Sequence, residues 1–140
     1  MIVLPIAVAV LAFYLRIKPR LLQKDFGIDS WYFLLYAEEF RKIRRIPVKL
    51  PYFMLDLEDQ WYPPGLAIFL SFFPQRLLEK FNFAISALID VLQVLLLYFI
   101  SYLLSKSHGI SFFSALLYAT SPILITQNSN LNSRSLGALI

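Results

Sequence analysis

The chain has 140 residues, of which 59% are hydrophobic and 16% are charged, and its mean hydropathy is +0.65. Soluble domains average about 45–50% apolar and about 25% charged residues, so both percentages of this chain are typical of a membrane protein. The absence of cysteine excludes a disulfide framework and any thiolate metal site. The net charge of +4 comes largely from basic residues beside apolar runs. This placement favours contact with anionic membrane lipids and argues against nucleic acid as a partner.

Four apolar runs predict membrane spans. The first covers about 1–17, where Arg16 and Lys18 are expected to reach towards the headgroups, and Pro19 is expected to end the helix. This run lacks a basic segment before it and a small-residue cleavage site after it, which favours an uncleaved anchor over a signal peptide. The later spans are expected at 64–78, 81–104 and 110–126, and a fifth begins at 136. Because the chain stops inside that last run, we expect the N-terminal part of a longer membrane protein.

The first large loop, 18–63, holds an expected amphipathic helix. Asp29 and Ser30 offer an N-cap, and from Trp31 the apolar residues recur at helical spacing until Pro47 ends the pattern. The predicted apolar face comprises Phe33, Tyr36, Ala37, Phe40 and Ile43. Glu38 and Lys42 are spaced to pair on the other side. A helix with an aromatic face and a basic end is suited to lying in the plane of the membrane interface.

Two carboxylates stand out in the sequence. Asp29 follows the first span, where it could deprotonate a hydroxyl group or help to bind a divalent ion, or simply cap its helix. Asp90 lies in the middle of the run 81–104. It either faces an aqueous cavity or is a buried carboxylate bonded to a neighbouring helix.

Other polar residues have more ordinary interpretations. The acids Asp56, Glu58 and Asp59 could form a cation site or belong to an unremarkable loop. Arg134 could meet a phosphate or lipid headgroups. His108 has no second histidine or cysteine nearby, so no metal ligand is assigned. The motifs GxxxxGK[ST], GxSxG, HExxH and GxGxxG are absent, which leaves soluble-enzyme classes without support.

The order of these parts resembles the N-terminal region of the polyprenyl-phosphate-dependent glycosyltransferases of the C-type superfamily (GT-C). This superfamily includes the protein O-mannosyltransferases and the lipid A aminoarabinose transferase type. The residues that carry the resemblance are GIDSWYF at the start of the loop, YAEEFRKIRRIP in its helix, the YPPG turn, and SPILITQNSNLNSRSLG near the end of the chain. Family members often show paired acids where this chain has Asp29, with Asp25 four residues before it.

The resemblance implies an all-α, polytopic transmembrane helix bundle with an interfacial amphipathic helix in its first large loop. It implies an integral-membrane enzyme that moves a sugar from a polyprenyl-phosphate donor to a hydroxyl acceptor on a protein, lipid or glycan. Asp29 would be the catalytic base, and the expected substrate-binding residues are Asp59, Tyr62 and Arg134. Basic side chains near the interface, or a divalent cation, would meet the departing phosphate. This N-terminal piece is expected to be inactive alone.

The orientation of the first loop and the class of protein each have an alternative interpretation. The nine Lys and Arg residues between Arg16 and Trp61 would place the first loop in the cytoplasm by the positive-inside rule. The resemblance places the loop on the outer side of the membrane, and we adopt this orientation. We expect a multi-pass protein, located in the plasma membrane if the host is prokaryotic. The alternative class is a non-catalytic multi-span protein, either a transporter or flippase-like partner or a structural subunit. A transporter would depend on Asp90 more than on Asp29.

Overall fold

The computed structural model describes residues 3–22, 28–50 and 63–129, and every regular element in these ranges is a helix. The all-α prediction is therefore confirmed for the described part of the chain. The helices in order are α1 (Val3–Leu22), α2 (Ile28–Ile43), α3 (Gly65–Ser71), α4 (Gln75–Ser105), α5 (His108–Thr120) and α6 (Pro122–Asn128).

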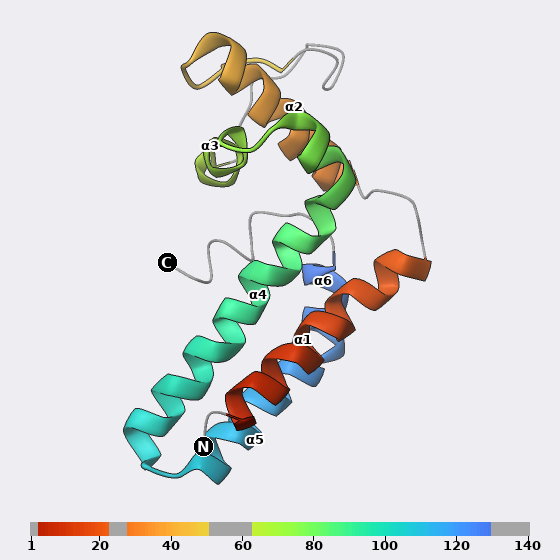
Figure 1. The fold of residues 1–140 in the computed structure, drawn as a ribbon. Coiled ribbons are helices and arrows are strands. Elements are labelled where there is room, and N and C mark those ends of the chain that lie inside the picture. The colour runs from red at the N-terminus through yellow and green to blue at the C-terminus, as the bar shows by residue number, and fades with distance from the viewer. Residues whose placement is uncertain (1–2, 23–27, 51–62, 130–140) are drawn as a thin grey trace.

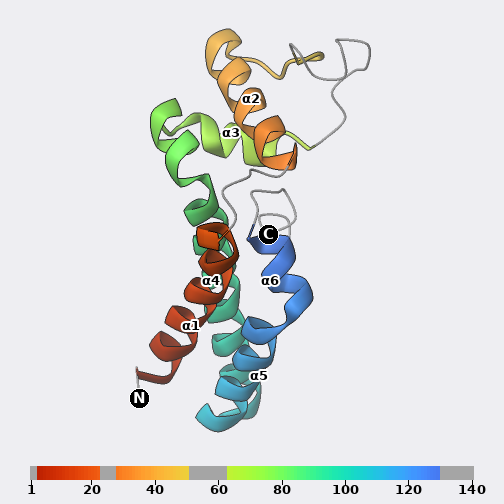
Figure 2. The ribbon, with the colours of Figure 1, turned by 90° about the vertical axis from the view of Figure 1, so that its right-hand side faces the viewer.

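Helices α1, α4 and α5 lie side by side and form a bundle, and α6 continues from the end of α5 (Figures 1 and 2). Small side chains line much of its interior and let the helix backbones approach closely. The buried small residues are Ala12, Ser86, Ala87, Ser111, Ala115 and Ala119.

Helices α2 and α3 pack on each other and lie across the N-terminal end of α4 (Figure 1). We call α2, α3 and this end of α4 the platform. Its buried core consists of large apolar side chains, among them Phe33, Tyr36, Leu66, Leu70 and Leu78. The predicted apolar face of α2 is thus largely confirmed. That face is covered by α3 and the start of α4, however, so its aromatic rings are not available to enter a membrane.

The predicted run 81–104 forms one continuous helix that ends at Ser105. Helix α4 begins earlier, at Gln75, and has a kink at Phe81, whose φ of −125° and ψ of 16° depart from helical values. The side-chain amide of the next residue, Asn82, donates to the carbonyl of Glu79 at 3.4 Å, and side chains that enter the backbone ladder are a common cause of kinks. The kink separates the part of α4 in the platform from the part in the bundle.

Three other expectations about the spans are corrected. The segment 64–78 is not one helix: α3 has only seven residues, about 10 Å at 1.5 Å per residue, and a turn at 72–74 separates it from α4. The segment 110–126 is divided at Ser121, whose extended conformation precedes Pro122. Pro19 does not end α1, which continues to Leu22.

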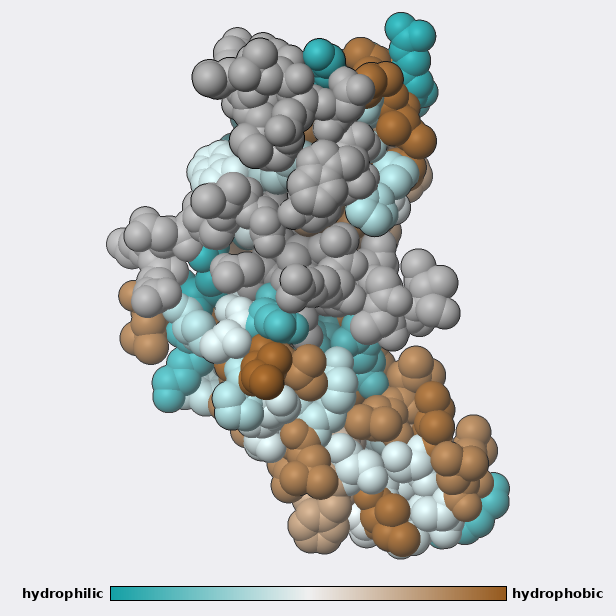
Figure 3. All heavy atoms as spheres, turned by 180° about the vertical axis from the view of Figure 1, so that it is seen from behind, coloured by the Kyte–Doolittle hydropathy of each residue, from teal (hydrophilic) through white to brown (hydrophobic). Residues whose placement is uncertain are grey.

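Among the described residues, α4 alone is long and apolar enough to cross a membrane. Only 39% of its most apolar window is buried, so most of that window faces outward. Leu88, Leu92, Leu96, Phe99 and Leu103 form an exposed stripe at helical spacing along its outer side. Seen from behind, brown apolar side chains also lie on the outer surface of the lower part of the molecule (Figure 3).

Candidate functional site

The residues that the sequence singled out are not brought together by the described structure. The backbone of Asp29 lies in the first turn of α2, which begins one residue earlier at Ile28, so the expected N-cap at Asp29 is not confirmed. Asp59, Tyr62 and Arg134 lie outside the described residues, as do Asp25, Asp56 and Glu58.

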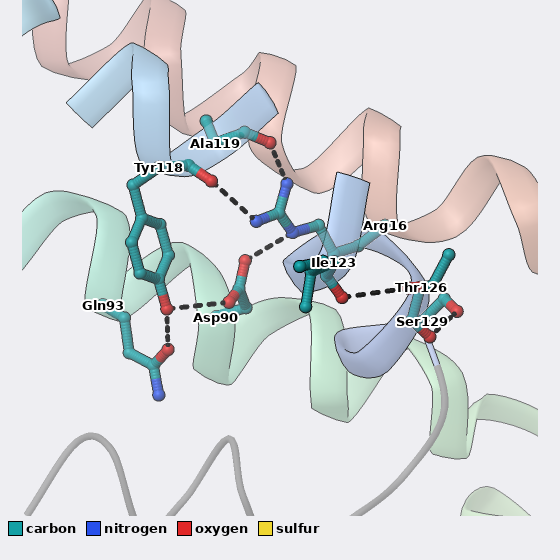
Figure 4. Close-up of polar contacts among 8 residues, drawn as sticks. All are labelled: Arg16, Asp90, Gln93, Tyr118, Ala119, Ile123, Thr126 and Ser129. Carbon is teal, nitrogen blue, oxygen red and sulfur yellow. Dashed lines mark hydrogen bonds and ion pairs between the residues drawn. The ribbon is translucent and has the colours of Figure 1, made fainter. Parts of the chain in front are cut away.

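The structure instead shows a buried polar cluster in the bundle, formed by Arg16 of α1, Asp90 and Gln93 of α4, and Tyr118 of α5 (Figure 4). The Arg16 Nε atom lies 2.5 Å from Asp90 Oδ2, and both side chains are fully buried. The Tyr118 hydroxyl donates to Gln93 Oε1 at 2.5 Å and lies 3.4 Å from Asp90 Oδ1. The cluster therefore ties three helices together.

Arg16 also caps the C-terminal end of α5. Its guanidinium donates to the carbonyl of Ala119 and lies 3.5 Å from the carbonyl of Tyr118 (Figure 4). The last carbonyls of a helix lack partners within it, and Pro122 has no N–H to offer them. A cation at this end is further favoured by the helix dipole. The break at Ser121 thus leaves the Ala119 carbonyl as an acceptor for Arg16.

The expectation that Arg16 reaches towards the headgroups is wrong, because its guanidinium turns into the bundle. Of the two interpretations of Asp90, the structure shows the carboxylate bonded to neighbouring helices. A signal was present in the sequence: Arg16 and Asp90 are opposite charges at the edge or middle of apolar runs. What the sequence lacked was the alignment of α1 with α4, which brings them together.

The chemistry open to this cluster is limited. Burying two charges is costly, and here their mutual attraction and the additional hydrogen bonds of Arg16 and Asp90 offset part of the cost. Because Arg16 neutralises it and Tyr118 contacts its second oxygen, Asp90 is not an open base. The cluster is suited to fixing the positions of helices.

His108 is the one histidine of the chain and begins α5. Its Nδ1 atom lies 3.0 Å from the hydroxyl of Tyr98, and its ring stacks on Tyr102 with centroids 4.3 Å apart. These contacts join the end of α4 to the start of α5. Within residues 3–22, 28–50 and 63–129, no group of three or more His, Cys, Asp or Glu side chains could hold a metal ion.

No protein-family profile, curated protein or solved structure matches the chain.

Proposed function

We propose that the chain is the membrane-embedded part of a multi-pass glycosyltransferase that moves a sugar from a polyprenyl-phosphate donor to a hydroxyl acceptor. The observation that carries the proposal is the position of α2. This helix follows α1 and lies across the end of the bundle (Figure 1), and its first turn contains Asp29. A lipid-linked donor would present its phosphate and sugar at that level.

The membrane part of the proposal rests on the polarity of the bundle. Its interior holds the charged and polar side chains of Arg16, Asp90 and Gln93 beside small residues and a few larger apolar ones, whereas its outside is lined with large apolar side chains. In water this arrangement would expose apolar surface while burying charge. In lipid, close packing through small residues and interhelical polar bonds is the ordinary way to hold helices together.

The proposed reaction needs few groups. The acceptor hydroxyl oxygen attacks the anomeric carbon of the sugar, the bond from that carbon to the phosphate oxygen breaks, and the phosphate leaves with the electron pair. Asp29 would take the hydroxyl proton. Basic side chains at the interface, or a divalent cation, would stabilise the charge on the departing phosphate.

A second candidate is a non-catalytic membrane protein, which the polar cluster favours. Ionisable residues inside membrane segments often mark substrate or ion pathways. A protein of that class would depend on Asp90 and Arg16 more than on Asp29.

The test compares sugar transfer by membranes from cells that express the complete gene, with a panel of polyprenyl-phosphate sugars. Asp29→Asn is the test variant, and Glu38→Gln is the matched control, because it removes one charge from the exposed side of the same helix. We expect Asp29→Asn to abolish transfer at equal protein level and Glu38→Gln to retain it. Transfer that survives Asp29→Asn would contradict the role of Asp29. No transfer from any donor would favour the non-catalytic class.

A further inference from the structure

The C-terminal end of α2 and the segment 44–49 that follows it carry exposed apolar and basic side chains. Ile43, Ile46 and Val48 are exposed, as are Arg44, Arg45 and Lys49. Phe72, in the turn between α3 and α4, is 80% exposed, more than almost any other large apolar residue described. We call residues 43–49 together with Phe72 the tip of the platform.

The tip has a rigid support. Arg41 donates from Nε to the carbonyl of Ser71 at 3.1 Å and from Nη2 to the carbonyl of Phe73 at 2.7 Å. These two bonds hold the turn that carries Phe72 against α2. Between the two elements lies a cavity of about 460 Å³, which Arg41, Arg44 and Phe72 help to line.

Two positive charges of the tip, those of Arg44 and Arg45, have no acid paired with them within the described residues. The acids nearest to it on α2, Glu38 and Glu39, pair with Lys42 at 3.0 and 2.7 Å. There is no acid in segments 40–50 and 71–74. Among the described residues, the side chains of Arg44 and Arg45 form no hydrogen bond or ion pair. Arg44 itself closes the helix in a left-handed conformation with φ of 56°, and its N–H donates to the carbonyl of Phe40 at 2.8 Å.

We propose that the tip docks on anionic phospholipid headgroups of the bilayer that holds the bundle. Guanidinium groups bind phosphate oxygens, and the neighbouring exposed apolar side chains would enter the layer between headgroups and acyl chains. Because α2 lies across the end of the bundle, the tip extends sideways from it and not along its axis (Figure 1). The lipid contact of the platform is then its basic tip, while the aromatic face of α2 serves as its core. This inference rests on the membrane location but not on sugar transfer.

The absence of cysteine allows a clean test. Val48→Cys, at an exposed position of the tip, carries a nitroxide label, and the protein is placed in nanodiscs of phosphatidylcholine alone or mixed with phosphatidylglycerol. The measurement is the accessibility of the label to oxygen, which concentrates in lipid, against that to a water-soluble relaxation agent. We expect the label to shift to the lipid environment in the mixed discs, and the shift to weaken at high salt.

Two variants decide whether the arginines carry the effect. Arg44→Asn should lower the ratio of docked to undocked label about fivefold, because one basic residue near an anionic surface contributes about that factor. Lys106→Asn is the matched control: Lys106 also ends a helix in a left-handed conformation, with φ of 53°, but at the other end of α4. Asparagine tolerates that conformation in both places.

Three results would overturn the proposal. One is a label whose accessibility to oxygen, relative to that to the water-soluble agent, is the same in both kinds of nanodisc. Another is an equal effect of Lys106→Asn and Arg44→Asn. The third is displacement of the label by inorganic phosphate at constant ionic strength, which would assign the tip to a soluble phosphate ligand. Failure of the protein to enter nanodiscs would instead contradict the membrane location on which the proposed function also rests.

Discussion

The bundle buries a charged pair beside its apolar side chains, whereas the buried core of the platform consists of apolar side chains. In the bundle, a fully buried arginine and aspartate lie among alanines, serines, Val8, Val94 and Tyr98, and many leucines and phenylalanines face outward. In the platform, tyrosine, phenylalanine and leucine are inside, and Lys42, Arg44 and Arg45 are outside. Apart from its tip, the platform largely follows the rule for domains in water, whereas the bundle buries charge and exposes large apolar side chains.

The difference shows what holds each region together. The platform gains from removing apolar surface from water, at about 25 cal/mol for each Å². The bundle cannot gain in that way if lipid surrounds it, so packing of small residues and interhelical polar bonds must supply the attraction. Substitution of the buried polar residues should therefore destabilise the bundle, and cavity-forming substitutions should destabilise the platform.

The largest expected effect comes from removing one member of the buried ion pair. Arg16→Ala leaves Asp90 charged and uncompensated, and breaking such a pair costs about 3–5 kcal/mol. Denaturant titration of the protein in mild detergent micelles, followed by circular dichroism, measures this loss. The double variant Arg16→Met with Asp90→Leu should recover most of it, because both charges are gone. A double variant as unstable as Arg16→Ala would show that packing, and not the unpaired charge, sets the cost.

A cavity in the platform should have a slightly smaller and more local effect. Leu70 is fully buried in the platform core, and Leu→Ala at such a site costs about 2–5 kcal/mol. Hydrogen exchange by mass spectrometry should show faster exchange in α2 and α3 after Leu70→Ala, with α1 and α5 unchanged. Leu88→Ala, on the exposed side of α4, is the control and should leave all helices protected. Equal loosening of α1 would mean that the two regions unfold as one unit.

Removing the hydroxyl of the polar cluster should cost less. Tyr118→Phe deletes the bond to Gln93 and the contact with Asp90, a loss of about 1 kcal/mol for a typical hydrogen bond. The same titration measures it, with Tyr14→Phe as the control because the Tyr14 ring is exposed. If Tyr118→Phe left stability unchanged, the bonds of Arg16 to Asp90 and to the end of α5 would be sufficient without the Tyr118 hydroxyl.

The smallest effect is expected at Lys42. Its exposed side chain pairs with Glu39 and Glu38, which raise its pKa above the ordinary value of 10.5. A raised pKa in the folded state adds stability that is present below that ordinary value and is lost as the pH rises through the higher, folded value. At neutral pH, Lys42→Gln should shift the unfolding midpoint little, because exposed pairs are weak. A decrease in stability as large as that of Tyr118→Phe would contradict the exposed character of this side of α2.

The sequence by itself determined the local features. Residue spacing predicted a helix from Trp31 up to Pro47. The observed helix is Ile28–Ile43, which ends before Pro47 because Arg44 is left-handed, and it contains the expected Glu38–Lys42 pair at 3.0 Å. The apolar run 81–104 predicted the long helix. These features depend on contacts within a few residues, where helical periodicity is decisive. The role of Asp29 remains a prediction, since it depends on a substrate.

Only the tertiary structure decided which charges meet and which faces are covered. Arg16 and Asp90 are 74 positions apart, and their contact depends on the alignment of α1 with α4 and on the Ala119 carbonyl beside the break at Ser121. The aromatic face of α2 could have met lipid or protein, and packing with α3 settled it. Periodicity marks a face as apolar but does not say what covers it, because that depends on segments distant in the chain.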